Sequence, residues 1–191
     1  MNLSALILAG GKSSRMGRDK AWLEIDGQPL IKRQIALLHQ LCVTEVFISG
    51  RADTDYSALG CTVLRDTFID AGPLAGIERG LAATTSSFLL VLAVDLPRME
   101  LGFLQILFGA CGRAVGVVPL VRSKTEPLIS IYPKQIHPIA VQHLEDGRYA
   151  VNQFVDVCRK AGMVLDYTVA SANEHVFLNW NAPGDLSKSE C

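Results

Sequence analysis

The sequence lacks a charge excess of either sign, and it also lacks paired cysteines and long apolar runs. Its 191 residues carry a formal net charge of -1, so no strong field directs the chain to nucleic acid or to a membrane surface. The five cysteines include no Cys-x-x-Cys pair, which disfavours a zinc site and a disulfide framework. The apolar runs at 3–9 and 88–94 are far shorter than the roughly 20 residues that span a bilayer. We therefore expect a soluble, cytoplasmic protein.

What the sequence does contain is a regular alternation of strand and helix signals. Apolar residues make up 49% of the chain, enough for a substantial core, and the length favours a single domain over 1–191. Repeated strand-helix-strand order predicts a three-layer, mainly parallel, Rossmann-like α/β sheet with helices on both faces. Such sheets bind ligands beyond the carboxyl ends of their strands. Strands are expected at 3–9, 43–49, 61–64, 87–94, 114–121, 127–132 and 163–169, and helices at 29–41, 74–83, 101–111, 134–144 and 151–161.

The segment after the first expected strand carries the groups that a phosphate ligand needs. Gly10, Gly11 and Gly17 would let backbone N–H groups approach phosphate oxygens, and Arg15 and Lys20 add positive charge. The segment follows neither GxxxxGKS/T nor GxGxxG, so the usual sequence signature of a dinucleotide-dependent dehydrogenase is missing. The alternative is an ordinary glycine turn with solvated basic residues, which two glycines alone would favour.

The same segment, LAGGKSSRMGRDK at 8–20, resembles the signature loop LAGGxSxRMGxDK of the MobA-like nucleotidyltransferases. Within that superfamily the chain most resembles the molybdenum cofactor guanylyltransferases, because the cytidylyl relatives usually carry LAAG in place of LAGG. The resemblance implies the fold of the nucleotide-diphospho-sugar transferases. It also implies nucleotide contacts at Leu8, Ala9, Gly10, Gly11 and Lys20, with catalytic roles for Arg15 and Lys20.

A second motif, GPLAG at 72–76, combines a turn with the start of a helix. By itself it would be a plain loop-to-helix junction. It resembles the guanine-side motif of the guanylyltransferases, and this resemblance places Gly72, Pro73 and Leu74 in the base pocket. The same resemblance implies that Asp66 contacts the nucleotide. Ser49 stands where these enzymes often carry Asn, and its hydroxyl can still offer a hydrogen bond.

Asp95 follows an apolar strand and precedes Leu96-Pro97. A carboxylate at the carboxyl end of a buried strand lies where the ligand is expected. Mg²⁺ is typically held by one or two carboxylates together with phosphates and water, so one Asp is chemically sufficient. An Asp that caps the next turn is the alternative. The sequence VDLP resembles the DxP metal motif of the family, which implies that Asp95 binds Mg²⁺ and the nucleotide and is catalytic.

Asn179 and Asn181 are two residues apart, so both would point to the same side of an extended segment. Two carboxamides on one face offer donors and acceptors to a polar heterocycle such as a pterin. A pair of turn-forming Asn residues is the alternative. The segment resembles the FxNxNTPxDL ending of the family, with departures at Ala182 and Gly184. Glu126 is a weaker candidate for the acceptor side.

Together these resemblances imply an enzyme that transfers GMP from GTP to the phosphate of molybdopterin and releases pyrophosphate. Mg²⁺ would be its cofactor, and molybdenum-insertion proteins or molybdoenzymes would be transient partners. Catalysis would rest on positioning and electrostatic stabilisation, because a phosphate monoester is already anionic near neutral pH. No Ser/His/Asp or Cys/His set is needed for such a reaction, and none is apparent.

Three other functions stay open at this point. Two are related enzymes, a molybdopterin cytidylyltransferase and a transferase acting on a sugar or polyol phosphate. The third is a non-catalytic carrier of molybdopterin or nucleotide. The presence of both Lys20 and Asp95 argues against the carrier, because a binder needs no metal beside the triphosphate.

Overall fold

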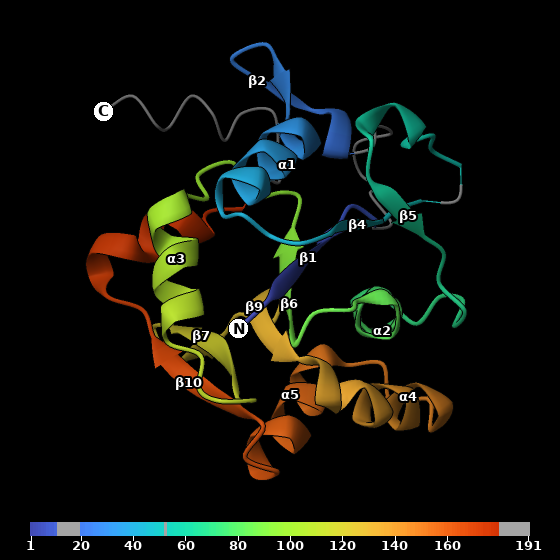
Figure 1. Cartoon of the computed structure of the whole chain (residues 1–191), viewed down its shortest axis with the longest axis vertical. Coiled ribbons are helices and arrows are strands. Elements are labelled where there is room, and N and C mark those ends of the chain that lie inside the picture. The colour runs from blue at the N-terminus through green and yellow to red at the C-terminus, as the bar shows by residue number, and fades with distance from the viewer. Residues whose placement is uncertain (11–19, 52, 180–191) are drawn as a thin grey trace.

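The protein is described from a computed structural model, and the described residues are 1–10, 20–51 and 53–179. An eight-stranded mixed sheet forms the centre of the fold, and helices cover both of its faces (Figure 1). In chain order its strands are β1 (Leu3–Leu8), β4 (Val46–Ser49), β5 (Thr62–Leu64), β6 (Phe88–Ala93), β7 (Gly116–Val121), β8 (Lys124–Thr125), β9 (Ile129–Pro133) and β10 (Val164–Thr168). A small hairpin, β2 (Glu24–Ile25) and β3 (Gln28–Pro29), stands apart from the sheet.

The helices connect these strands in the way that parallel pairing requires. Among the described residues, the α-helices are α1 (Leu30–Gln40), α2 (Pro73–Ala83), α3 (Leu101–Gly109), α4 (His137–Glu145) and α5 (Val151–Lys160). The same residues also form the short 3₁₀ helices η1 (Lys20–Trp22), η2 (Ser57–Leu59), η3 (Lys134–Ile136) and η4 (Ser171–Phe177). The helix expected at 134–144 is therefore a 3₁₀ turn followed by an α-helix.

The sheet has the order β10-β7-β9-β6-β1-β4-β5, with β8 paired to β7. The strands β5, β4, β1 and β6 run parallel to one another, and so do β7 and β10. Strand β9 lies between β6 and β7 and runs antiparallel to both. The predicted mainly parallel α/β sheet is thus confirmed, with β9 reversed in its middle and the two-residue β8 also antiparallel to β7.

The reversal follows from a tight turn after β7. Arg122 and Ser123 both have positive φ, 48° and 67°, as the two central residues of a type I′ hairpin turn do. The next residues pair back on β7 as β8, and the Glu126 amide donates to the Pro119 carbonyl at 2.9 Å. Because no crossover helix intervenes, the chain must return along the sheet in the opposite direction.

The apolar run of the first strand serves two cores at once. Ala5 and Ile7 pack in the cluster with α1 and α3, whereas Leu6 and Leu8 pack in the cluster with α2, α4 and α5. Successive side chains of a strand point to opposite faces, so a strand covered on both faces must be apolar throughout. Figure 1 shows the two helix layers on either side of the sheet. Within the described ranges, no helix combines the length and the apolar character needed to cross a bilayer.

Candidate functional site

Four parallel strands end level with one another along one edge of the sheet. Leu8 of β1 pairs with Ser49 of β4 on one side and with Ala93 of β6 on the other. Ser49 in turn pairs with Leu64 of β5. The residues that follow these strands therefore leave the sheet at the same carboxyl edge, where ligands of open α/β sheets bind.

A polar contact at this edge joins Lys20 to Asp95, 75 residues apart in the chain. Lys20 Nζ donates to Asp95 Oδ2 at 3.0 Å. The two side chains are 24% and 22% exposed, so the pair is largely shielded yet open to a ligand. The prediction from sequence assigned a triphosphate contact to one and a metal to the other, and the fold brings these two side chains together.

The Asp95 carboxylate fits the requirements of a magnesium ligand. Within the described part of the chain, its only hydrogen bond is the one that Oδ2 accepts from Lys20, so Oδ1 can still accept a ligand. No group of three or more His, Cys, Asp or Glu side chains that could hold a metal occurs among residues 1–10, 20–51 and 53–179. A lone hard oxygen donor suits Mg²⁺, which completes its coordination with phosphates and water, better than it suits zinc.

Ser49 and Asp66 form the other flank of the site. The Ser49 side chain is buried, and its hydroxyl donates to Asp66 Oδ1 at 3.4 Å. Desolvation within the fold raises the pKa of Asp66, and the hydrogen bond from Ser49 opposes that rise. Two residues predicted to contact the nucleotide are therefore direct neighbours.

The start of α2 lies against this flank. Gly72 has φ 68° and ψ -159°, a conformation that side chains disfavour, and Pro73 begins the helix. The backbone of Gly76 approaches Ser49 so closely that an added Cβ would lie 2.5 Å from its Oγ. The α2 N-terminus, which carries the positive end of the helix dipole, is thereby fixed at the edge where a nucleotide would bind.

The structure narrows the roles of several predicted nucleotide contacts. Leu74 is fully buried in the core, so only its backbone, and not its side chain, can border a base pocket. Leu8 and Ala9 are buried as well. The amides of Ala9 and Gly10 donate to the Ser49 carbonyl at 2.9 Å and 3.0 Å, so neither N–H is available to a phosphate in this arrangement. We expect Gly10 to permit close approach of the ligand instead of supplying a donor.

Four predicted residues cannot be placed. Gly11, Arg15, Gly17 and Asn181 lie outside the described residues. Asn179 is described and exposed, and it directly follows η4 and Leu178. No contact tests its predicted role toward a pterin.

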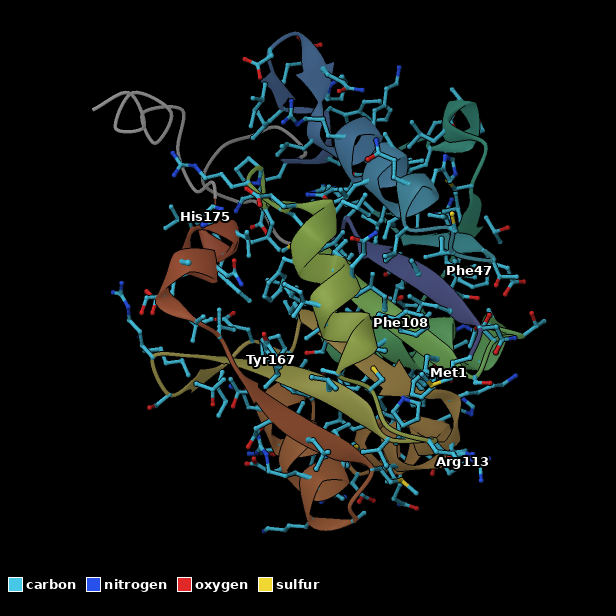
Figure 2. All side chains as sticks on the ribbon, turned by 60° about the vertical axis from the view of Figure 1, so that its left-hand side comes forward. Met1, Phe47, Phe108, Arg113, Tyr167 and His175 are labelled. Atoms are coloured by element: carbon cyan, nitrogen blue, oxygen red, sulfur yellow. The ribbon has the colours of Figure 1, made fainter. Side chains whose placement is uncertain are left out.

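The short helix η4 is attached to the beginning of α3, just beyond the Asp95 segment. Phe177 packs edge-on against Phe103 with ring centroids 5.2 Å apart. His175 Nε2 lies 2.9 Å from Glu100 Oε1, and its Nδ1 lies 2.8 Å from the Ala172 carbonyl oxygen. Figure 2 shows His175 on this helix, at the opposite end of the molecule from Met1 and Arg113. These contacts lead the chain toward Asn179 at the same end as the site.

The two acceptors around His175 predict a pH-dependent attachment of η4. Both ring nitrogens can donate only in the imidazolium form, and the hydrogen bond to Glu100 raises the pKa of His175. A raised pKa in the folded state means that the stabilisation is complete below the ordinary value of roughly 6.5 and is lost as pH rises through the folded pKa. Ring-proton NMR should show His175 titrating above its value in the denatured chain. Glu100→Gln should return it toward that value, and an unchanged titration in this variant would contradict the assignment.

Two further side chains, Glu126 and Gln34, lie near Asp95 in the fold, and the sequence patterns did not single them out clearly. Glu126 was only a weak candidate, but the Ala93 amide donates to the Leu128 carbonyl at 2.9 Å, which brings the Glu126 segment beside Asp95. Burial raises the pKa of Glu126.

Gln34 was not predicted at all. It is the one polar residue among Ile31, Ile35 and Leu38 on the buried side of α1, a break in the apolar pattern that could have drawn attention to it.

Known proteins of one family match this chain over most of its length. The family model described as the MobA-like NTP transferase domain matches residues 5–160. A probable molybdenum cofactor guanylyltransferase from Opitutus terrae is 34% identical over 97% of this chain and 94% of that protein. A molybdenum cofactor guanylyltransferase from Pseudomonas paraeruginosa is 39% identical over 70% of this chain and 69% of that protein.

Solved structures show the same fold at lower identity. Molybdopterin-guanine dinucleotide biosynthesis protein A from Archaeoglobus fulgidus aligns with a TM-score of 0.73 at 20% identity, covering 97% of this chain and 95% of that one. A 2-C-methyl-D-erythritol 4-phosphate cytidylyltransferase from Thermus thermophilus aligns with a TM-score of 0.76 at 19% identity, covering 100% and 98%. With the family model matching more than half of its length, this chain belongs to the MobA-like NTP transferase family.

Proposed function

We propose that this protein transfers GMP from GTP to the phosphate of molybdopterin and so forms the guanine dinucleotide form of the molybdenum cofactor. The observation that carries the proposal is the Lys20–Asp95 pair at 3.0 Å on the carboxyl edge of the sheet. Support for the substrates comes from relatives named molybdenum cofactor guanylyltransferase at 34% and 39% identity.

In the proposed reaction, a phosphate oxygen of the acceptor attacks the α-phosphorus of GTP. A new phosphorus–oxygen bond forms, the bond between the α-phosphorus and the bridging oxygen breaks, and pyrophosphate leaves with the electron pair. The attacking phosphate is anionic near neutral pH, so the main obstacle is repulsion between anions. Lys20 would offset that charge, since its Nζ already lies among the groups at this edge.

Mg²⁺ belongs to this proposal as the expected cofactor, with Asp95 as its protein ligand. When bound, it would neutralise phosphate charge and polarise the phosphorus–oxygen bonds. The chain's own contribution is to hold one shielded carboxylate 3.0 Å from a lysine, so that the negative and positive groups are placed before the ligand arrives.

Ser49, Asp66 and Gly72 are proposed to contact the nucleotide, and Asn179 to contact the pterin. The first three lie on the flank formed by β4, β5 and α2, whereas Asn179 follows η4 beside α3. This arrangement supports a nucleotide on one side of Asp95 and an acceptor on the other. We place the protein in the cytoplasm, in transient contact with molybdenum-insertion proteins or molybdoenzymes, and the free thiols of its described cysteines suit that compartment.

Nucleotide choice is the direct test of this proposal. Purified protein is incubated with molybdopterin, Mg²⁺ and each nucleoside triphosphate in turn, and pyrophosphate release and the dinucleotide product are measured. We expect kcat/KM for GTP to exceed that for CTP by about 100-fold, because buried polar groups arranged for one base are left unpaired by another. Equal turnover of GTP and CTP would reject the guanine assignment. Transfer to a sugar or polyol phosphate in place of molybdopterin would reject the acceptor assignment, and binding without transfer would indicate a carrier.

A further inference from the structure

Gln34 places a polar side chain in the apolar layer between α1 and the sheet. It is 3% exposed, and its neighbours on the same side of the helix are Ile31, Ile35 and Leu38. Burying a carboxamide is costly unless its groups form hydrogen bonds. Gln34 Nε2 donates to the Leu96 carbonyl at 2.8 Å, across 62 residues of sequence.

This hydrogen bond holds the segment that contains Asp95 against α1. Before Asp95, the Val94 amide donates to the Leu8 carbonyl of β1 at 3.2 Å. After it, the Leu96 carbonyl accepts from Gln34. The backbone of Asp95 is therefore held on one side by the sheet and on the other by α1.

The same helix also bears on the position of Lys20. The Leu30 amide, at the first residue of α1, donates to the Leu23 carbonyl at 2.9 Å. The Leu23 amide donates to the Lys20 carbonyl at 3.2 Å. Helix α1 is thus joined by hydrogen bonds to both partners of the Lys20–Asp95 pair, and Gln34 supplies the link to the Asp95 side.

Stability alone does not explain a glutamine at this position. The Leu96 carbonyl also accepts from the Met99 amide at 3.2 Å, so it would stay satisfied without Gln34. Gln34 Oε1 is buried and has no hydrogen-bond partner in the described part of the chain, which is an energetic cost. An apolar residue of similar size would avoid that cost.

We propose that Gln34 is a positioning residue, which holds the Asp95 segment against α1 so that the carboxylate is aimed at Lys20 and at the Mg²⁺ proposed to bind there. The inference rests on the proposed function for its catalytic meaning. The structural part of the proposal, that Gln34 restrains the backbone of residues 94–99, can be measured independently of any activity.

The test compares Gln34→Met with Leu38→Met. Both substitutions lie on the buried side of α1, and both introduce the same flexible side chain, but only the first removes a hydrogen bond to the Asp95 segment. We expect Gln34→Met to lower kcat about 10-fold and to raise the Mg²⁺ concentration at half-maximal rate about 10-fold, as loss of a ligand-orienting contact typically does. The KM for GTP should change less than about twofold, since uniform binding is not removed. Leu38→Met should change none of these.

Amide hydrogen exchange supplies the second readout. The amides of residues 94–96, 98 and 99 should exchange faster in Gln34→Met than in the original protein or in Leu38→Met, while the melting temperature stays within about 4 °C. Unchanged exchange, or an unchanged Mg²⁺ dependence in an active enzyme, would overturn the positioning role. If the original protein fails to transfer GMP, the proposed function falls, and the exchange comparison still decides whether the clamp exists.

Discussion

Asp95→Asn is expected to lower kcat/KM for GMP transfer by about 1000-fold while the fold stays intact. Asn has nearly the same shape as Asp, so the turn that begins at Leu96 should form as before. The carboxamide carries no charge and is a poor ligand for Mg²⁺ compared with a carboxylate. It also removes the negative charge that lies 3.0 Å from the Lys20 ammonium, so the charge pattern that meets the triphosphate changes. Initial rates measured over a range of Mg²⁺ concentrations test this expectation.

Glu45→Gln provides the matched control for Asp95→Asn. Glu45 is also a partly buried carboxylate that accepts hydrogen bonds, from the Ser4 hydroxyl at 2.9 Å and the Thr85 amide at 3.2 Å. It precedes β4, whereas the site lies at the other end of that strand. Glu45→Gln should leave kcat/KM within about twofold of the original value, because the Glu45 charge is too far from the site to act through salt-containing solvent. If Asp95→Asn kept more than a tenth of the activity with unchanged Mg²⁺ dependence, the metal assignment would be wrong.

Gly76→Ala should weaken GTP binding more than any other single methyl group added to α2. The new Cβ would lie 2.5 Å from Ser49 Oγ and 2.9 Å from Leu8 Cδ2. Ser49 is short and buried, so it cannot move aside, and α2 must shift away from β1 and β4. That shift displaces Gly72 and the helix N-terminus. We expect destabilisation of about 1–3 kcal/mol, with a loss of about 10-fold or more in GTP affinity. Denaturant unfolding and calorimetric titration with GTP measure the two effects.

Gly80→Ala on the same helix separates local geometry from a general effect on α2. Its added Cβ would meet Leu89 Cδ2 at 2.8 Å and Leu6 Cδ2 at 2.9 Å, which are the ends of flexible side chains and can give way. Alanine also gains about 1 kcal/mol of helix propensity over glycine at both positions. Gly80→Ala should therefore change GTP affinity less than about twofold. Equal losses in the two variants would show that contact with Ser49 is not what matters.

Much of this fold could be predicted because its strands are buried on both faces. The runs at 3–9 and 87–94 are apolar at nearly every position, which is typical of central parallel strands, and the structure places them side by side as β1 and β6. The reversal at β9 could not be predicted in the same way. Its turn uses Arg122 and Ser123 at positive φ in place of the Asn-Gly or Asp-Gly residues that signal such hairpins.

The part of the candidate site that depends on the order of strands and loops could be predicted from the sequence. Asp95 and Lys20 each follow from position, one at the end of a strand and one in a basic loop, and the fold places them in contact. Leu74 shows what a motif leaves open, because a motif letter does not tell whether a residue would meet a ligand with its backbone or with its side chain, and the Leu74 side chain is buried in the core. Gln34 shows the complementary failure. Its importance depends on a hydrogen bond to Leu96, and no sequence period predicts which distant carbonyl a buried amide will meet.

The reversed strand β9 lies between two groups of parallel strands, β5, β4, β1 and β6 on one side and β7 and β10 on the other. Ser49, Asp66 and Gly72 come from the half of the fold encoded before β6, and Glu126 and Asn179 come from the half encoded after it, with Asp95 at the boundary. Since β9 begins where β6 ends, the residues proposed to face the acceptor come from segments encoded after those proposed to contact the nucleotide. Such a partition would allow new acceptors to be recruited while the nucleotide chemistry is inherited unaltered.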